Sequence, residues 1–160
     1  MAAMASAEVP AAKVAEVPYT VFYWTSAEKF RGRAFAPIAI LEEAGAAYDL
    51  KAPDDPARPG GTFAAPIIAS PSGAQVAQVP AICRTLGHEL GLAPEDPAAD
   101  AKALQICCDA VDFVSEADKE GKVEGERKQK WLAHFDTLLK DDHPVNYSVK
   151  TSGPIPEIIH

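Results

Sequence analysis

The order of secondary structure predicted for the first part of this chain constrains its fold more than any other feature. Runs rich in aromatic and β-branched residues, bounded by turn-forming residues, predict strands at residues 19–24, 48–50, 66–69 and 74–77. Apolar residues at helical spacing predict helices at residues 32–44 and 80–90. The resulting order, β-α-β-β-β-α, gives a mixed sheet with helices packed on it, so we expect the α/β class.

In the rest of the chain, the cap residues and the apolar periodicity predict helices and no strands. Asp96 and Pro97 form a typical helix start, an N-cap followed by a proline at the first helical position. Two broad apolar stripes follow, which suit a helix buried between neighbours. A later amphipathic helix carries Trp131 and Phe135. We divide the chain into a flexible tail (1–18), an α/β domain (19–92), a helical region (96–140) and a second tail (141–160).

Composition excludes several classes of function. The chain has 15 basic and 23 acidic residues, a net charge of −8, and no basic patch that would bind nucleic acid. No apolar run is long enough to cross a membrane, so we expect no membrane partner. Residues 1–18 fit neither a signal peptide nor a transit peptide, and we expect a cytoplasmic protein.

The cysteines and histidines predict neither a disulfide framework nor a metal site. Cys83, Cys107 and Cys108 are odd in number and contain no C-x-x-C motif, so we expect three reduced, mostly buried thiols on helices. Adjacent cysteines of one helix cannot bridge without distorting it. The four histidines are dispersed, and their spacing matches no zinc pattern.

Several stretches, taken in order, resemble glutathione transferases. They are Tyr23-Trp24, RGRAF (31–35), ILEEAG (40–45), FAAPII (63–68), QVAQVPAICRTLG (75–87) and LGLAPEDPAADAKALQ (90–105). The resemblance covers residues 19–139 and is closest to the tyrosine-type classes, which share the RGRA loop. It implies a thioredoxin-like, glutathione-binding domain followed by a truncated form of the family's all-α domain.

The resemblance implies that Tyr23 donates its hydroxyl to the glutathione thiolate. The alternative is that Tyr23 is an ordinary core aromatic residue. Seven residues separate Tyr23 from the RGR motif, more than is usual in the family, and Ser26 lies among them. Other classes of the family use a serine in this region, so Ser26 is the substitute candidate.

Two further elements of a glutathione site are implied. Arg33 is suited to a carboxylate of glutathione because its donors form a fork, although a surface ion pair is the alternative. The Ala65–Pro66 peptide is expected to be cis, which would let the backbone of Ala65 pair with the cysteinyl backbone of glutathione. The alternative is a trans proline in an edge strand.

Gln78 and Val79 depart from the family pattern. At these positions the family has an acidic or amide residue followed by Ser or Thr, whose hydroxyl holds the γ-glutamyl carboxylate. Val79 has no hydroxyl, and losing such a hydrogen bond costs about 1.5–3 kcal/mol. Either the site is weakened, with the helix N-terminus still available, or this copy no longer binds glutathione.

Two functions therefore remain open. The first is an enzyme that uses glutathione as co-substrate, without a metal, to conjugate small hydrophobic electrophiles, as in detoxification. The second is a non-catalytic scaffold or assembly subunit, because a partial helical domain leaves apolar helix faces that bind a partner or aggregate. In either case we expect a homodimer or a larger assembly.

Overall fold

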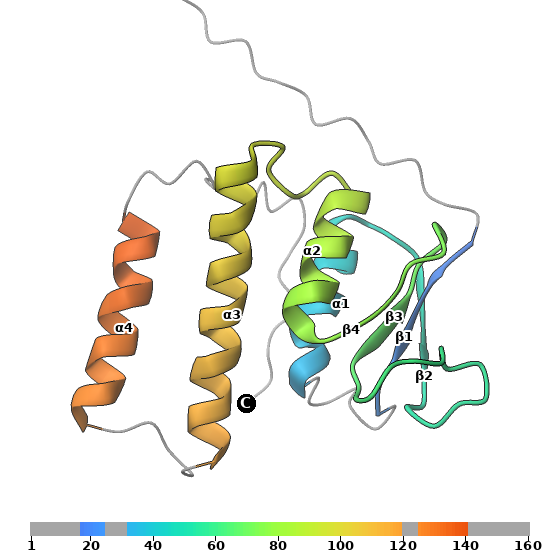
Figure 1. Cartoon of the computed structure of the whole chain (residues 1–160), viewed down its shortest axis with the longest axis horizontal. Coiled ribbons are helices and arrows are strands. Elements are labelled where there is room, and N and C mark those ends of the chain that lie inside the picture. Colours follow the sequence, from blue (N-terminus) through green and yellow to red (C-terminus); the bar gives the residue numbers. More distant parts are fainter. Residues whose placement is uncertain (1–16, 25–31, 120–124, 141–160) are drawn as a thin grey trace, which may run out of the picture. The chain divides into compact units, whose positions relative to one another are not determined.

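The computed structural model describes residues 17–24, 32–119 and 125–140, which are coloured in Figure 1. The chain divides into two compact units, 1–115 and 116–160. Most of the two predicted tails, together with Ser26, lies outside the described residues. The predicted boundary between 92 and 96 falls at the turn that leads into the third α-helix, and it remains a prediction.

The first unit contains a four-stranded mixed sheet. Its strands are β1 (Tyr19–Phe22), β2 (Tyr48–Lys51), β3 (Ile67–Ala69) and β4 (Gln75–Ala77). The spatial order is β2-β1-β3-β4, in which β1 pairs parallel with β2 and antiparallel with β3, and β3 pairs antiparallel with β4. With the helices below, this confirms the predicted α/β class and the β-α-β-β-β-α order.

The helices of the chain begin and end close to the predicted positions. They are the 3₁₀ turn η2 (Gly32–Ala34) and the α-helices α1 (Phe35–Glu43), α2 (Val79–Glu89), α3 (Pro97–Lys119) and α4 (Gly125–Lys140). Gly45 follows α1 with φ of 63° and Gly91 follows α2 with φ of 69°, a conformation that glycine adopts without a steric cost. The first three residues of the predicted helix 32–44 are a 3₁₀ turn and not α-helix.

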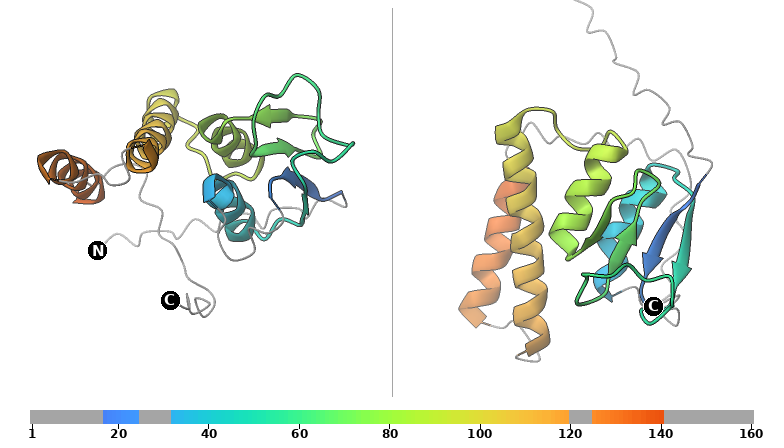
Figure 2. Two further views of the ribbon diagram at one scale, coloured as in Figure 1. Left: turned by 90° about the horizontal axis from the view of Figure 1, so that it is seen from below. Right: turned by 45° about the vertical axis from the view of Figure 1, so that its right-hand side comes forward.

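The core lies between the sheet and the pair α1 and α2, which cover one of its faces (Figure 2). Side chains of a strand alternate between the faces of the sheet, so Tyr19, Val21 and Tyr23 point toward the helices. They pack there against Ile38 of α1 and Leu86 of α2. The position of Tyr23 beside α1 is therefore set by the strand period.

Helix α3 is held to α2 by polar contacts near its N-terminus. Asp96 caps α3 by accepting a hydrogen bond from the backbone N–H of Ala99 at 2.8 Å, which confirms the predicted cap. One turn later, the Asp100 carboxylate accepts hydrogen bonds from Arg84 Nη2 at 2.7 Å and His88 Nε2 at 2.9 Å. Asp100 is only 9% exposed, so both partners satisfy a carboxylate that has lost most of its water.

The prediction that α3 is buried between neighbours was wrong for its apolar stripe. Ala99 and Asp100 are the buried residues among the described side chains of this helix. Leu104 and Val111 are partly exposed, and Cys108 is exposed. The periodicity identified an apolar face, but within 1–115 no described element covers it.

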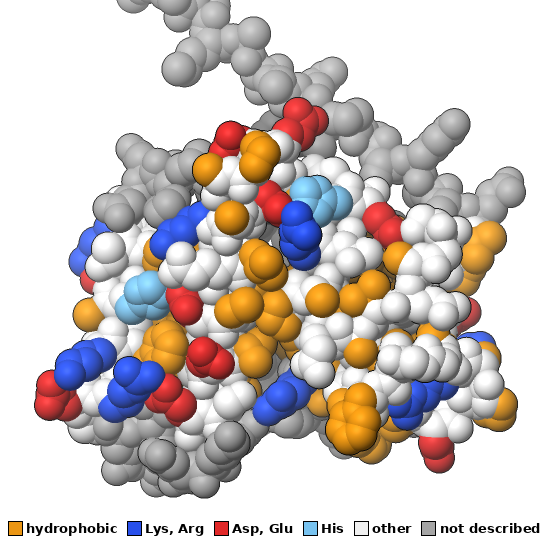
Figure 3. All heavy atoms as spheres, viewed as in Figure 1, with side chains coloured by type: hydrophobic (Ala, Val, Ile, Leu, Met, Phe, Trp, Pro, Cys, Tyr) orange, Lys and Arg blue, Asp and Glu red, His pale blue; other side chains and the backbone are white. Residues whose placement is uncertain are grey.

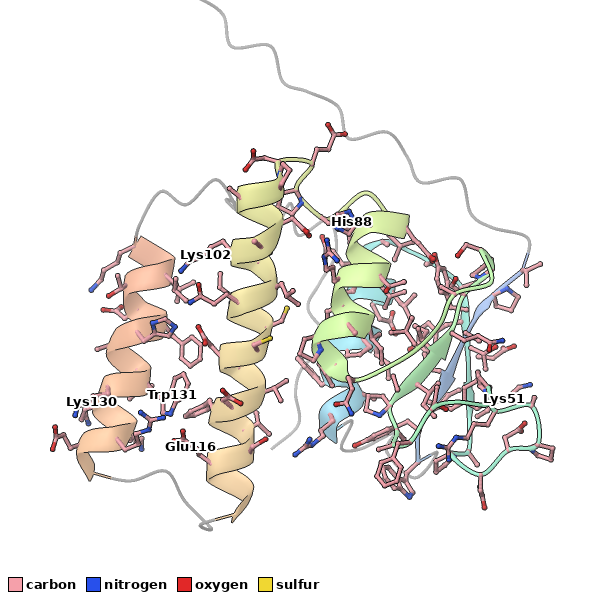
Figure 4. All side chains as sticks on the ribbon, viewed as in Figure 1. Lys51, His88, Lys102, Glu116, Lys130 and Trp131 are labelled. Atoms are coloured by element: carbon pink, nitrogen blue, oxygen red, sulfur yellow. The ribbon has the colours of Figure 1, made fainter. Side chains whose placement is uncertain are left out.

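In the second unit, the end of α3 contacts α4 through Glu116. Its carboxylate pairs with Arg127 and accepts a hydrogen bond from Trp131 Nε1 at 2.9 Å, and Figure 4 shows Glu116 and Trp131 pointing toward one another. Arg127, followed by Trp131, lowers the pKa of Glu116 to about 2. Trp131 also stacks on Phe135 with ring centroids 5.7 Å apart, so the predicted apolar face of α4 is an aromatic cluster. No described helix is both long and apolar enough to span a bilayer.

Candidate functional site

The register of the sheet brings three of the predicted site residues to one edge. Phe22 pairs with Ile67, and Ile67 pairs with Ala77 on its other side. The residues just beyond these pairs are Tyr23, Pro66 and Gln78, so all three lie where neighbouring strands end. Strand β2, the other neighbour of β1, ends at Lys51, whose carbonyl accepts a hydrogen bond from the backbone N–H of Tyr23 at 2.9 Å.

Tyr23 is held at this edge by two hydrogen bonds, one through its backbone N–H and one through its phenolic oxygen. Its side chain is 8% exposed and lies on the core face of the sheet. The phenolic oxygen accepts a hydrogen bond from the backbone N–H of Arg33 at 3.1 Å. The hydroxyl hydrogen has no acceptor among the described residues, so this group can still donate to a ligand.

The partner of Tyr23 is the start of the helical segment that contains η2 and α1. Arg33 contributes its backbone N–H, while its side chain is exposed. Backbone N–H groups at a helix start carry partial positive charge and stabilise anions. An anion beside Tyr23 would therefore accept a hydrogen bond from the hydroxyl, and the partial positive charge at the start of the helical segment would stabilise it further.

The Ala65–Pro66 peptide is cis, as expected from the sequence. Pro66 is buried and Ala65 is partly buried against the core. Strand β3 begins at Ile67, where both of its ladders end, so Ala65 lies two residues before the paired strand. The backbone N–H and C=O of Ala65 have no hydrogen-bond partner among the described residues, which leaves both groups available to a ligand.

Gln78 has a backbone conformation that is uncommon for any residue except glycine. Its φ is 73° and its ψ is 121°, and its side chain is exposed and does not cap α2. Backbone strain of this kind costs about 1–3 kcal/mol and is concentrated at functional sites. The outlier thus supports a binding role for the turn between β4 and α2.

The first turn of α2 contains backbone N–H groups that have no acceptor among the described residues. Val79 is the first residue of the helix, and Pro80 has no N–H. The N–H groups of Val79 and Ala81 have no acceptor among the described residues, while that of Ile82 bonds to the Gln78 carbonyl. Two unsatisfied donors at a helix start favour a carboxylate, although the predicted hydroxyl at position 79 is missing.

Exposed aromatic residues stand near the same edge. Trp24 is 54% exposed and packs edge-on against Tyr23 with ring centroids 4.8 Å apart. Phe63 is 95% exposed, on the loop that leads to Ala65. The Arg58 guanidinium holds this loop by donating to the carbonyls of Pro53, Thr62 and Phe63 at 3.1, 2.7 and 3.1 Å.

A groove of about 570 Å³ lies between α2 and α3. It is lined by Gln78, Pro80, Ala81, Arg84, Thr85, His88, Leu104, Cys108, Val111 and Asp112. Apolar side chains gather along this face in Figure 3. The groove was not predicted from the sequence, because a groove between two helices depends on how they pack. Only the uncovered apolar stripe of α3 could have indicated it.

The structure brings together Tyr23, Ala65, Pro66, Gln78 and Val79, and it places the backbone of Arg33 beside Tyr23. It does not place the Arg33 guanidinium or Ser26 in the site: the first is exposed and the second lies outside the described residues. Within the described ranges there is no group of three or more potential metal ligands.

Comparison with known proteins gives the fold. No protein-family model and no curated protein match the chain. The solved structure of NaGST1 matches with a TM-score of 0.56 and 22% identity, over 78% of this chain and 68% of NaGST1. NaGST-2 matches with a TM-score of 0.56 and 21% identity, over 76% of this chain and 67% of NaGST-2. The glutathione S-transferase from Ascaris lumbricoides is 26% identical over 80% of this chain and 64% of its own, with a TM-score of 0.49. The matches to NaGST1 and NaGST-2 show that the chain has the glutathione transferase fold, a thioredoxin-like unit followed by part of the helical domain.

Proposed function

We propose that this chain binds glutathione at the sheet edge formed by Tyr23, Ala65 and Gln78, and activates its thiol for conjugation to small electrophiles. The observation that carries the proposal is the Tyr23 hydroxyl, which is bound by the backbone N–H of Arg33 and retains its own hydrogen for a ligand. The glutathione transferase fold adds to it.

Each residue of the proposed site would bind a different part of glutathione. The backbone of Ala65 would pair with the cysteinyl backbone of glutathione as a short added strand. The N–H groups of Val79 and Ala81 would receive the γ-glutamyl carboxylate at the start of α2. The exposed side chain of Arg33 would approach a carboxylate of the same ligand.

Tyr23 would act on the sulfur. A free thiol has a pKa of about 8.5, and only the thiolate is a good nucleophile. A hydrogen bond from the Tyr23 hydroxyl would stabilise the thiolate and raise its fraction at neutral pH. The thiolate would then attack an electrophilic carbon, forming the S–C bond as the leaving group departs with its electron pair.

The first experiment is glutathione binding by calorimetry, together with the ultraviolet absorbance of the bound thiolate. Turnover with a small aromatic electrophile would be measured on the same protein. Binding with a thiolate signal and turnover supports the enzyme. Saturable binding without a thiolate or turnover would restrict the proposal to glutathione binding, and no binding would refute it.

A non-catalytic scaffold is the second candidate function. Val79 in place of a hydroxyl residue favours it, and so do the exposed apolar side chains of the helical part, which include Val114 (44% exposed), Leu132 (47%) and Leu139 (86%). Exposed apolar patches mark interaction surfaces. Wild-type protein that binds no glutathione but forms a stable assembly would favour this function.

We also propose that the protein is cytoplasmic and forms a homodimer, with Phe63 as an interface anchor. A fully exposed aromatic side chain on a loop that three hydrogen bonds hold in place is preorganised for binding. Sedimentation velocity should give a dimer that Phe63→Ala weakens. Val17→Ala should leave the dimer intact. Val17 is an exposed apolar residue that precedes Tyr19, the first residue of β1, and so lies at the end of the strand opposite Tyr23. A monomer at all concentrations would exclude this proposal.

A further inference from the structure

The loop between β2 and β3 contains an arginine to which the proposed glutathione site assigns no role (Figure 1). Residues 52–66 form no helix or strand, and Arg58 lies near the middle of them, partly buried. Its Nη1 donates to the Pro53 carbonyl at 3.1 Å, and its Nη2 donates to the carbonyls of Thr62 and Phe63 at 2.7 and 3.1 Å. One guanidinium therefore joins the start of the loop to its end.

Short-range contacts hold the backbone from which this side chain extends. The Arg58 N–H donates to the Asp55 carbonyl at 2.9 Å, and Asp55 Oδ1 accepts a hydrogen bond from the Ala57 N–H at 2.7 Å. The next residue, Pro59, is buried, and its carbonyl accepts a hydrogen bond from Thr62 Oγ1 at 2.8 Å. Because the guanidinium extends from an ordered turn, it can restrain both ends of the loop.

The hydrogen-bond partners of the guanidinium are neutral carbonyls. No carboxylate of residues 17–24, 32–119 or 125–140 pairs with Arg58. Hydrogen bonds from a charged donor are stronger than those between neutral groups. The planar guanidinium also places two nitrogens in a fixed geometry, whereas the ammonium of lysine is a single point charge. The residue type therefore suits a cross-link within the loop, and Arg58 is not a partner in a surface ion pair.

This cross-link lies next to the backbone groups of Ala65. The Phe63 carbonyl belongs to the peptide that immediately precedes the one carrying the Ala65 N–H. On the other side, Ile67 is fixed in the sheet by its pairing with both neighbouring strands. The N–H and C=O of Ala65, which have no hydrogen-bond partner among the residues that the structure describes, thus lie between two anchored points.

We propose that Arg58 is a positioning residue of the glutathione site, which holds the segment before Ala65 so that the Ala65 backbone stays in place for the cysteinyl part of the ligand. This inference rests on the proposed function, which supplies the ligand. A loop that is ordered before binding loses less conformational entropy when the ligand binds, so the affinity is higher. The sulfur is assigned to Tyr23, so Arg58 should act on affinity and leave the activation of the thiol unchanged.

The experiment measures glutathione binding to the full chain by calorimetry, in the wild type and in Arg58→Ala. We expect the variant to bind roughly ten-fold or more weakly, because the hydrogen bonds that order the loop are lost. The pKa of the bound thiol, measured by thiolate absorbance at saturating glutathione, should stay at its wild-type value. This pattern is the reverse of the one expected for Tyr23→Phe, in which the thiol pKa should rise and the affinity should change little.

Arg58→Lys separates geometry from charge. It retains the positive charge that would attract an anionic ligand, but it cannot join both ends of the loop, so it should bind glutathione nearly as weakly as Arg58→Ala. Millimolar guanidinium chloride should restore part of the affinity of Arg58→Ala by binding the same carbonyls. Sodium chloride at equal ionic strength should not restore it, which excludes a general effect of salt.

Thr62→Val is the matched control within the loop. It removes the hydrogen bond from Thr62 Oγ1 to Pro59 and leaves the guanidinium and its carbonyl acceptors in place, so the affinity should stay within about two-fold of wild type. Circular dichroism verifies the fold of each variant, and Arg58→Lys tests the inference even where Arg58→Ala fails to fold. Amide hydrogen exchange at Phe63 and Ala65 should be faster in both arginine variants than in the wild type.

The outcomes distinguish this inference from the proposed function. A wild type that binds no glutathione refutes the proposed function, and the role of Arg58 with it. If the wild type binds glutathione and either arginine variant binds it equally tightly, the role of Arg58 alone is overturned. An equal loss of affinity in Thr62→Val would also overturn it, because the effect would then belong to the loop in general.

Discussion

The phenolic oxygen of Tyr23, just beyond the end of the central strand, accepts a hydrogen bond from the backbone N–H of Arg33 at 3.1 Å. This bond ties the strand to the start of the helical segment and orients the hydroxyl. The oxygen accepts this N–H, and the hydroxyl hydrogen has no acceptor among the described residues, so the hydroxyl can still donate to a ligand. The predictions for catalysis depend on this arrangement.

Tyr23→Phe should remove the donor and retain the packing. We expect glutathione affinity to change little, because the proposed contacts to the ligand are mainly to its backbone and carboxylates. The pKa of the bound thiol should rise toward its free value, and turnover should fall roughly ten-fold or more, as for a loss of about 1.4 kcal/mol. Stopped-flow turnover and a pH titration of thiolate absorbance measure both effects.

The matched control for this variant is Tyr48→Phe. Tyr48 pairs with Tyr19 at the opposite end of the sheet, and its hydroxyl donates to Glu42 Oε1 at 2.6 Å. This change removes a hydrogen-bonded phenol far from the proposed site, so turnover should stay within about two-fold of wild type. If Tyr23→Phe is silent and Ser26→Ala abolishes turnover, Ser26 is the hydroxyl donor.

Val79→Thr should strengthen glutathione binding. Threonine is close to valine in shape and adds a hydroxyl at the first residue of α2, where the backbone N–H groups of Val79 and Ala81 have no acceptor in the described part of the chain. A hydrogen bond to a charged carboxylate contributes about 1.5–3 kcal/mol, so affinity should rise roughly ten-fold or more. Calorimetry checks this, with Val79→Ala as the control that adds no hydroxyl. An equal affinity for both variants would show that the carboxylate does not bind at this position.

Asp100→Asn should destabilise the contact between α2 and α3. The Arg84 guanidinium, aided by His88, holds the pKa of the Asp100 carboxyl below its usual range, although partial burial opposes this. A lowered pKa in the folded state means that the stabilisation is complete above the unfolded pKa of about 3.9 and is lost as pH falls through the folded value. Denaturant midpoints should thus be lower for Asp100→Asn at pH 7, and the difference should shrink in acid. Asp112→Asn, which changes an exposed acid of the same helix, should have no such effect.

The Tyr19 hydroxyl should lose its proton at a higher pH than an ordinary tyrosine, and the folded protein should lose stability as it does so. Burial, followed by the nearby Glu89 carboxylate, raises the pKa of Tyr19 to about 12. A raised pKa in the folded state means that the stabilisation is complete below the unfolded value of about 10 and is lost as pH rises toward 12. Tyrosinate absorbance should show a late phenol that disappears in Tyr19→Phe and shifts to lower pH in Glu89→Gln. A late phenol that persists in Tyr19→Phe would contradict this assignment.

Local sequence rules predicted the elements and several of their details. The order β-α-β-β-β-α, the cis Ala65–Pro66 peptide and the Asp96 cap of α3 all agree with the structure. Each depends on a few neighbouring residues, or on a motif that the resemblance supplied. The same resemblance identified Tyr23 and Val79 as candidates, but it could not say what either residue contacts.

Tertiary packing alone decided those contacts. The bond between Tyr23 and Arg33 spans ten residues, and Asp100 meets Arg84 and His88 only because α3 returns along α2. The apolar stripe of α3 was predicted to be buried, yet its described residues line a groove, because periodicity marks an apolar face without specifying a partner. Sequence spacing determines which residues share a face of one element, and packing in three dimensions determines which faces come together.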